Sequence, residues 1–292
     1  MNRLRSSAPS LRHTNHGHAS GFTLIELVMV IIILGVLGGL TVNILLQPFL
    51  AFQDQSRRAA MVAEADLVLG RMVRELRMAL PNSVRINDNN DNYLEFIPVV
   101  DGGRYRARQD MTDPDNPSGD ALDFSNLDTR FDVLGGFLTG RAAAGDFLVI
   151  YNVSANDSTA NGNIANAYAG DNRTEIIAVG LNPATLQFES FQFPYPSLGA
   201  QRFDVVPASG PVSYYCDGNQ LFRATGYGYA ATQPTAFDPE NTRLLASNVT
   251  RCAFGYEWGG TMRNGVVTLQ LAFEEDGETI SLLYQAQVVN SP

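Results

Sequence analysis

The sequence has little or none of the residues on which several kinds of function depend. It contains no lysine, so all 20 basic residues are arginine, against 30 acidic residues and a formal charge of −10. Its three histidines, His13, His16 and His18, all lie in the first 18 residues. If that segment is removed, no histidine remains for a Ser–His–Asp or Cys–His catalytic system or for a His-ligated metal. The acidic balance also argues against a nucleic-acid partner, because phosphate binding needs clustered positive charge.

A long uncharged run lies near the N-terminus. Residues 27–46 contain no charged side chain, and twenty helical residues cover about 30 Å, the thickness of the hydrocarbon core of a bilayer. Arg3, Arg5 and Arg12 precede the run without any acidic residue, so the positive-inside rule predicts a cytoplasmic N-terminus. The run is too long for an ordinary signal peptide and has no small-residue cleavage site at its end. The sequence therefore predicts a single-pass segment in the inner membrane.

One acidic residue, Glu26, lies inside this apolar block. An ionised carboxylate in such a place costs several kcal/mol unless it is paired, and its own segment offers no basic partner. Cleavage between Gly21 and Phe22 would create a free α-amine on every copy of the chain. We therefore expect the Glu26 carboxylate to pair with the amine of a neighbouring copy that is shifted along the helix axis.

The residues from Gly21 to Leu27 read Gly-Phe-Thr-Leu-Ile-Glu-Leu, and they resemble the N-terminus of type IV pilins and type II secretion pseudopilins. The resemblance implies that a prepilin peptidase cleaves after Gly21 and methylates the amine of Phe22, and that Glu26 helps to register subunits during assembly. It also implies contacts with other major and minor pilins, an inner-membrane assembly platform, and a final location in an extracellular pilus. No catalytic residue and no cofactor is expected.

The family contains several kinds of subunit. Residues 81–292 make a segment of about 210 residues, which is large for a major pilin and favours a minor subunit. Stretches at 74–85, 212–216 and 248–252 resemble MSHA-type minor pilins (MshO-like), which take part in assembly, priming or tip formation. Pseudopilin J of type II secretion and PilW-type minor pilins are close alternatives. An alternative of another class is a membrane-anchored extracytoplasmic binding or adhesin domain that does not polymerise.

The helical pattern continues beyond the apolar run and then gives way to strands. Apolar residues recur every three or four positions from Val62 to Leu80, and Pro81 ends the pattern. The turn signals Asp217-Gly218 and Asp276-Gly277 indicate hairpins. The β-rich runs are 93–100, 146–153, 174–181, 185–193, 212–216, 244–258, 266–274 and 279–289.

Together these patterns predict an α+β fold, in which a long N-terminal helix packs on a C-terminal antiparallel β-sheet domain. The expected divisions are a cytoplasmic leader (1–21) that is removed, a transmembrane or filament-core helix (22–46), the amphipathic half of the helix (47–80), and a β-rich globular domain with long loops (81–292).

Two cysteines, Cys216 and Cys252, lie beside predicted strands of the domain that we expect outside the cytoplasm, where disulfides persist. The sequence predicts a bridge between them, and the alternative is a pair of buried free thiols. In the chain-entropy description, a bridge closing a loop of this size stabilises the fold by about 3–4 kcal/mol.

No metal site is predicted. The aspartates Asp88, Asp91, Asp113 and Asp115 could offer oxygen ligands to calcium. Their spacing lacks the regular ligand positions, the turn glycine and the terminal glutamate of an EF-hand loop. Solvated acidic loops are therefore the favoured interpretation.

Overall fold

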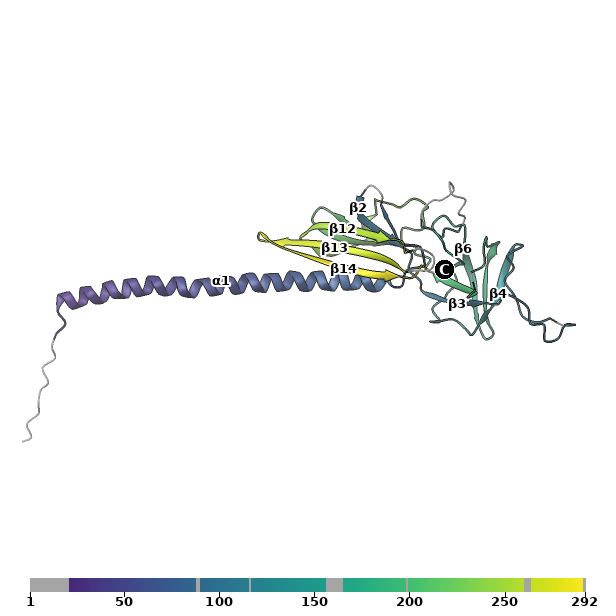
Figure 1. Ribbon diagram of the computed structural model, residues 1–292, viewed down its shortest axis with the longest axis horizontal. Coiled ribbons are helices and arrows are strands. Elements are labelled where there is room, and N and C mark those ends of the chain that lie inside the picture. Colours follow the sequence, from purple (N-terminus) through teal and green to yellow (C-terminus); the bar gives the residue numbers. More distant parts are fainter. Residues whose placement is uncertain are drawn as a thin grey trace, which may run out of the picture. The chain divides into compact units, whose positions relative to one another are not determined.

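A computed structural model of the chain describes residues 21–87, 90–115, 117–155, 165–197, 199–259 and 264–290. The described residues form one long helix, α1 (Leu24–Leu76), a 3-10 turn, η2 (Pro239–Asn241), and fourteen strands (Figure 1). The contacts divide the chain into two compact units, Met1–Ser56 and Arg57–Pro292. The second unit therefore contains the last turns of α1 and all the strands.

The strands are arranged in two open antiparallel sheets and one closed barrel. The first open sheet has the order β1-β2-β9-β10-β11, the second has the order β12-β13-β14, and the barrel has the order β3-β4-β7-β6-β5-β8. Their bounds are β1 (Arg85–Asn87), β2 (Asn90–Phe96), β3 (Asp101–Tyr105), β4 (Asp128–Leu134), β5 (Phe147–Val149), β6 (Arg173–Leu181), β7 (Ala184–Phe191), β8 (Arg202–Val206), β9 (Val212–Asp217), β10 (Gln220–Thr225), β11 (Thr242–Ser247), β12 (Val249–Glu257), β13 (Gly265–Glu275) and β14 (Glu278–Val288).

The two open sheets share one hydrophobic core with the last turns of α1. Leu69, Met72 and Leu76 follow one another at helical spacing and are fully buried in this core, as expected for one apolar face of a helix. Leu269 and Leu271 of β13 belong to the same core. At the far end of the β13–β14 hairpin, the exposed ion pairs Arg57–Asp276 and Arg58–Glu278 join the hairpin to α1.

The predicted disulfide is confirmed. Cys216 of β9 and Cys252 of β12 are bonded, with their Cα atoms 6.2 Å apart. Because β9 belongs to the five-stranded sheet and β12 to the three-stranded sheet, the bridge covalently joins the two sheets across their common core.

The barrel is an insertion into the five-stranded sheet. β2 and β9 are hydrogen-bonded neighbours, with Phe96 opposite Val212, and all six barrel strands lie between them in the chain. The barrel has its own core, in which Phe131 and Phe188 lie 5.9 Å apart between ring centroids, and Phe131 and Phe203 lie 5.3 Å apart. Aromatic rings therefore fill the interior, and the barrel is not a channel.

The predicted fold class, α+β with a long helix packed on a sheet, is wrong. Strands account for 40% of the structure and helix for 20%, and six of the strands close a barrel that the prediction does not contain. The sequence of β3 contains two glycines and shows no alternation, whereas β4 and β8 each contain the alternating run Arg-Phe-Asp-Val, which the prediction did not use. Closure also depends on pairing between strands that are distant in sequence, which periodicity does not report.

Several local predictions correspond to elements of the structure. The runs 174–181, 185–193, 266–274 and 279–289 correspond to β6, β7, β13 and β14 within a few residues. The helix continues through Pro48 and ends at Leu76 rather than Leu80. Asp276 and Gly277 have φ values of +51° and +80°, as required by a tight turn between the paired strands β13 and β14.

Candidate functional site

The N-terminal residues that the sequence singles out lie at the start of α1. Thr23 is the residue before the helix, and its carbonyl accepts hydrogen bonds from the backbone N–H of Glu26 and of Leu27, both at 3.1 Å. Its hydroxyl also accepts from the N–H of Glu26, at 3.3 Å. Threonine in this position satisfies amide donors that the first turn cannot pair internally. The helix therefore begins at Leu24, directly after the Thr23 cap.

The peptide bond between Gly21 and Phe22 precedes α1 and belongs to no helix or strand. Both residues are exposed, and the Phe22 side chain is 80% accessible. A Cβ atom added at Gly21 would meet nothing within 4 Å. Exposed backbone of this kind is accessible to a processing enzyme, and no neighbouring group in the described chain restricts what side chain residue 21 carries.

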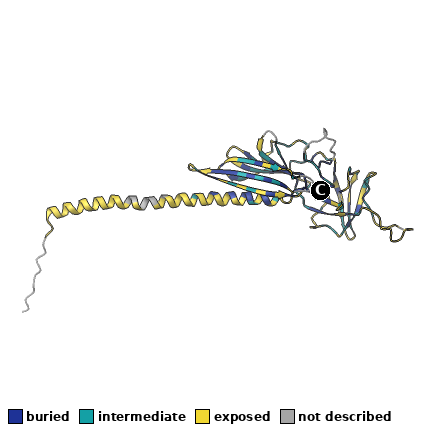
Figure 2. Cartoon of the chain, in the orientation of Figure 1, coloured by how far each residue is buried: buried dark blue, intermediate teal, exposed yellow. Residues whose placement is uncertain are grey.

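The first turns of α1 present an apolar surface that the described part of the chain does not cover. Residues Leu24–Thr41 have a mean hydropathy of 2.6, and none of them is buried (Figure 2). Such a helix is long and apolar enough to cross a membrane, as an anchor or a signal sequence does. Its surface needs a partner outside this chain, either lipid or other apolar helices.

Glu26 lies in the first turn of this apolar helix. Among the residues that the structure describes, none bonds to its carboxylate. The first turn is the positive end of the helix dipole, which favours a negative charge. That effect is small, so a carboxylate carried into an apolar environment still requires a cationic partner.

The calcium candidates do not converge in the described chain. Asp88 lies outside the described residues, and Asp91 belongs to β2. Asp113 accepts a hydrogen bond from the backbone N–H of Asp115 at 3.1 Å, a local turn interaction. Within the described residues, no group of three or more acidic, cysteine or histidine side chains is arranged to hold a metal ion.

A buried ion pair in the first hairpin was not predicted from the sequence. Arg85 of β1 lies directly opposite Glu95 of β2; its Nε donates to the Glu95 carboxylate at 2.6 Å, and both side chains are almost fully buried. Tyr227 also donates to Glu95, at 2.9 Å. Burial raises the pKa of Glu95, and the charge of Arg85 offsets only part of that shift. Opposite charges at cross-strand positions on both sides of the turn-rich stretch 87–92 are the signal that would have revealed the pair.

The remaining donors of Arg85 bind backbone carbonyls of two other segments. They reach the carbonyls of Ala230 and Ala231 at 2.9 and 2.6 Å and that of Ala155 at 3.3 Å. The guanidinium also stacks over the ring of Tyr168, 3.6 Å from its centroid. All directions around the guanidinium are thus occupied by the chain itself, so this pair is structural and offers nothing to a substrate.

A half-buried acid, Asp204 of β8, lies in the barrel wall opposite Gly102 of β3. Burial raises the pKa of Asp204 to about 6, and the charge of Arg202 offsets only part of this shift. A carboxylic acid whose pKa is higher in the folded chain than in the unfolded chain stabilises the fold when protonated and destabilises it when ionised.

We therefore expect an Asp204→Asn variant to be more stable than the natural chain at pH 7.5, by about 1–3 kcal/mol. The difference should shrink as the pH falls from about 6 towards the ordinary aspartate value near 4, because the natural side chain then becomes neutral too. Thermal unfolding of both proteins across this range measures the effect. A variant less stable at pH 7.5 would mean that attraction between Asp204 and Arg202 outweighs burial.

No known family model, curated protein or solved structure matches this chain. The resemblance of the Gly21–Leu27 motif to pilins therefore remains a prediction from the sequence.

Proposed function

We propose that this chain is a minor subunit of a type IV pilus-like filament, made as a membrane-anchored precursor and matured by a prepilin peptidase. The observation that supports this most is the exposed apolar helix Leu24–Thr41 with Glu26 in its first turn, a carboxylate to which none of the described residues bonds. A plain anchor needs the apolar surface but has no use for the acid. A helix that assembles with copies of itself or its relatives has a use for both.

The proposed maturation begins at the exposed Gly21–Phe22 bond. Hydrolysis of this amide releases the leader with a new carboxylate on Gly21 and leaves a free amine on Phe22. The amine then displaces the methyl group of a sulfonium methyl donor, which leaves as a thioether, and the amine loses one proton. The mature N-terminus then carries a positive charge four residues before Glu26. When two subunits are displaced along the axis by about one helical turn, the amine of one reaches the Glu26 carboxylate of the other. The ion pair offsets the free-energy cost of placing each charge in an apolar environment.

Assembly then exchanges one apolar environment for another. Before assembly, lipid surrounds the helix surface between Leu24 and Thr41. In the filament, equivalent surfaces of other pilins replace the lipid, as in the association of transmembrane helices. The unit Arg57–Pro292 faces outward and takes part in priming or capping the filament. The leader and the Glu26 charge are both expected of a pseudopilin J-like subunit as well, so the two identities share this mechanism.

The test is the chemical identity of the N-terminus. Mass spectrometry of the protein isolated from envelopes and from sheared fibres should find a first residue Phe22 with one added methyl group. A Gly21→Val variant should retain Met1 and its leader; because added atoms at residue 21 meet nothing within 4 Å, this loss reports recognition by the peptidase and not a folding defect.

A Gly35→Ala variant is the matched control, since Gly35 is also uncontacted, and it should be processed normally. A natural protein that keeps Met1 and is missing from fibres would overturn the proposal. The chain would then be a membrane-anchored extracytoplasmic binding domain that does not polymerise.

A further inference from the structure

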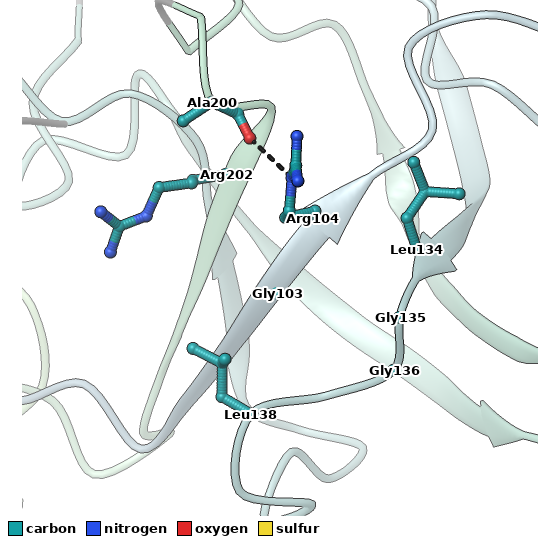
Figure 3. A pocket seen from close by; sticks show the side chains of 8 residues that line it. All are labelled: Gly103, Arg104, Leu134, Gly135, Gly136, Leu138, Ala200 and Arg202. Carbon is teal, nitrogen blue, oxygen red and sulfur yellow. Dashed lines mark hydrogen bonds between the residues drawn. The ribbon is translucent and has the colours of Figure 1, made fainter.

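A pocket of about 520 Å³ lies on the outer side of the barrel, where β3, β4 and β8 meet the loop that follows β4 (Figure 3). Its volume lies within the range of about 300–1,000 Å³ that is typical of small-molecule sites. Arg104 and Arg202 are the charged residues of its lining, and Leu134 and Leu138 are its large apolar residues, one on each side of β3 in Figure 3. In a chain with an excess of ten negative charges, a pocket lined by charges of the positive sign alone needs a physical reason.

The two arginines occupy an unfavourable arrangement. Arg104 of β3 and Arg202 of β8 are directly opposite each other across the strand pair, and like charges in such positions repel. Neither guanidinium forms an ion pair with an acid in the described chain. Elsewhere on the barrel, by contrast, Arg106 pairs with Asp132 at 3.1 Å and Arg130 with Asp120 at 2.7 Å.

Arg104 is held in place by one hydrogen bond, whereas none of the described residues forms a hydrogen bond or ion pair with the Arg202 guanidinium. The Nε of Arg104 donates to the carbonyl of Ala200 at 3.1 Å, which leaves its two terminal nitrogens available. Figure 3 shows the Arg104 guanidinium beside Ala200, whereas the Arg202 side chain extends away from Arg104. Rotation of the Arg202 side chain towards Arg104 would let one planar oxyanion accept hydrogen bonds from both guanidinium groups and remove their repulsion.

The acids nearest to this pair in the sheet form no ion pair with it in the described chain. Asp101 accepts four backbone N–H groups, among them those of Thr139 at 2.9 Å and Arg141 at 2.7 Å. Although burial raises its pKa, these bonds together hold the pKa of Asp101 below its ordinary value. Asp204 is two residues from Arg202 on β8 and forms no salt bridge within the described chain.

A backbone hydrogen bond holds the loop that carries Leu138 in place beside the pocket. The N–H of Leu138 donates to the carbonyl of Gly102 at 2.9 Å, which fixes the loop to β3. Gly135 and Gly136 have φ values of +77° and +83° and carry no side chain into the opening. Leu138 is 76% exposed, so a ligand that covers it gains free energy from burying its apolar surface.

From this juxtaposition we propose that the pocket binds an acidic saccharide. Its carboxylate or sulfate group lies between Arg104 and Arg202, and the C–H face of its ring packs on Leu134 and Leu138. A sugar acid combines these two kinds of surface in one small unit, whereas a neutral sugar leaves the arginines unpaired and a bare ion leaves the leucines uncovered. The site concerns the barrel alone, so it does not depend on whether the chain assembles into filaments.

Binding to the detergent-solubilised full chain tests the proposal. The probes are oligogalacturonate for carboxylated sugars, heparin fragments for sulfated sugars, neutral dextran, inorganic sulfate and single-stranded DNA. We expect binding of at least one acidic oligosaccharide, and an Arg104→Gln/Arg202→Gln variant should lose about tenfold to a hundredfold in affinity. The control Arg243→Gln/Arg251→Gln changes the net charge equally on other strands, outside the pocket, and should retain affinity.

A second pair of variants tests the apolar side of the pocket. Leu138→Asp places a like charge beside the ligand and should abolish binding, whereas Leu181→Asp, at an equally exposed leucine outside the pocket, should not. Both residues are exposed, so neither change should prevent folding, which the melting temperature checks. Equal losses in the pocket and control variants, equal binding of dextran or DNA, or no binding of either acidic oligosaccharide would overturn the proposal.

Discussion

In a Glu26→Ala variant, we expect synthesis and cleavage to proceed normally, while the amount of the protein in sheared filaments falls by about tenfold or more. The variant keeps the apolar surface of α1 and the exposed Gly21–Phe22 bond. It removes the carboxylate that we assign to the amine of a neighbouring Phe22, so that amine enters the filament core uncompensated. Immunoblots of the membrane and sheared fractions measure the ratio.

Two further variants separate the charge from other effects at this position. Glu26→Gln keeps the size of the side chain without its charge, and it should fail like the alanine variant. Glu64→Ala removes another exposed acid of α1 that lies outside the apolar stretch, and it should be incorporated normally. Normal incorporation of both Glu26 variants would exclude the pairing of carboxylate and amine as the reason for this residue.

An Arg85→Met variant should lose about 3–5 kcal/mol of stability, or fail to fold at 37 °C. It leaves the Glu95 carboxylate buried without its charged partner and also removes the bonds to the carbonyls of Ala155, Ala230 and Ala231. Denaturant unfolding of the solubilised chain at pH 7.5 gives the free energy of unfolding.

The pH dependence identifies the cause of that loss. Burial already raises the pKa of Glu95 in the natural chain, and the loss of Arg85 raises this pKa further. Glu95 of the variant is then neutral at moderately acidic pH, so the difference in stability should be smaller at pH 5 than at pH 7.5. The double variant Arg85→Met/Glu95→Leu should recover much of the loss, because it removes the unpaired charge. A deficit independent of pH would assign the loss to packing around Tyr168 and the carbonyl bonds instead.

The disulfide and the hairpins were predictable because their signals are short sequence motifs or follow from the expected side of the membrane. Asp276-Gly277 specifies a tight turn by its backbone preferences, whatever the sheet around it. The bridge between Cys216 and Cys252 followed from two cysteines beside strands in a domain expected outside the cytoplasm. Both inferences need no knowledge of which strands are neighbours.

The barrel and its pocket were not predictable in this way. β2 and β9 pair although more than a hundred residues separate Phe96 from Val212, and the inserted strands close on one another. No local pattern reports that Arg104 and Arg202 are opposite each other. The pair Arg85–Glu95 is intermediate in how far the sequence predicts it. Both residues flank a stretch rich in Asn and Asp, which suggests a hairpin, but the three residues of β1 are too few to show an alternating pattern.

The sequence by itself determined the chemistry of the N-terminal segment. The order of Gly21, Phe22 and Glu26 and the apolar stretch behind them depend only on covalent neighbours and helical rise. Only the tertiary structure decided how the strands of the β-rich remainder are arranged, with a closed barrel that places two arginines opposite each other beside Leu134 and Leu138. The physical reason is that strand pairing joins residues far apart in the chain, and the free energy of each pairing depends on every other strand in the sheet.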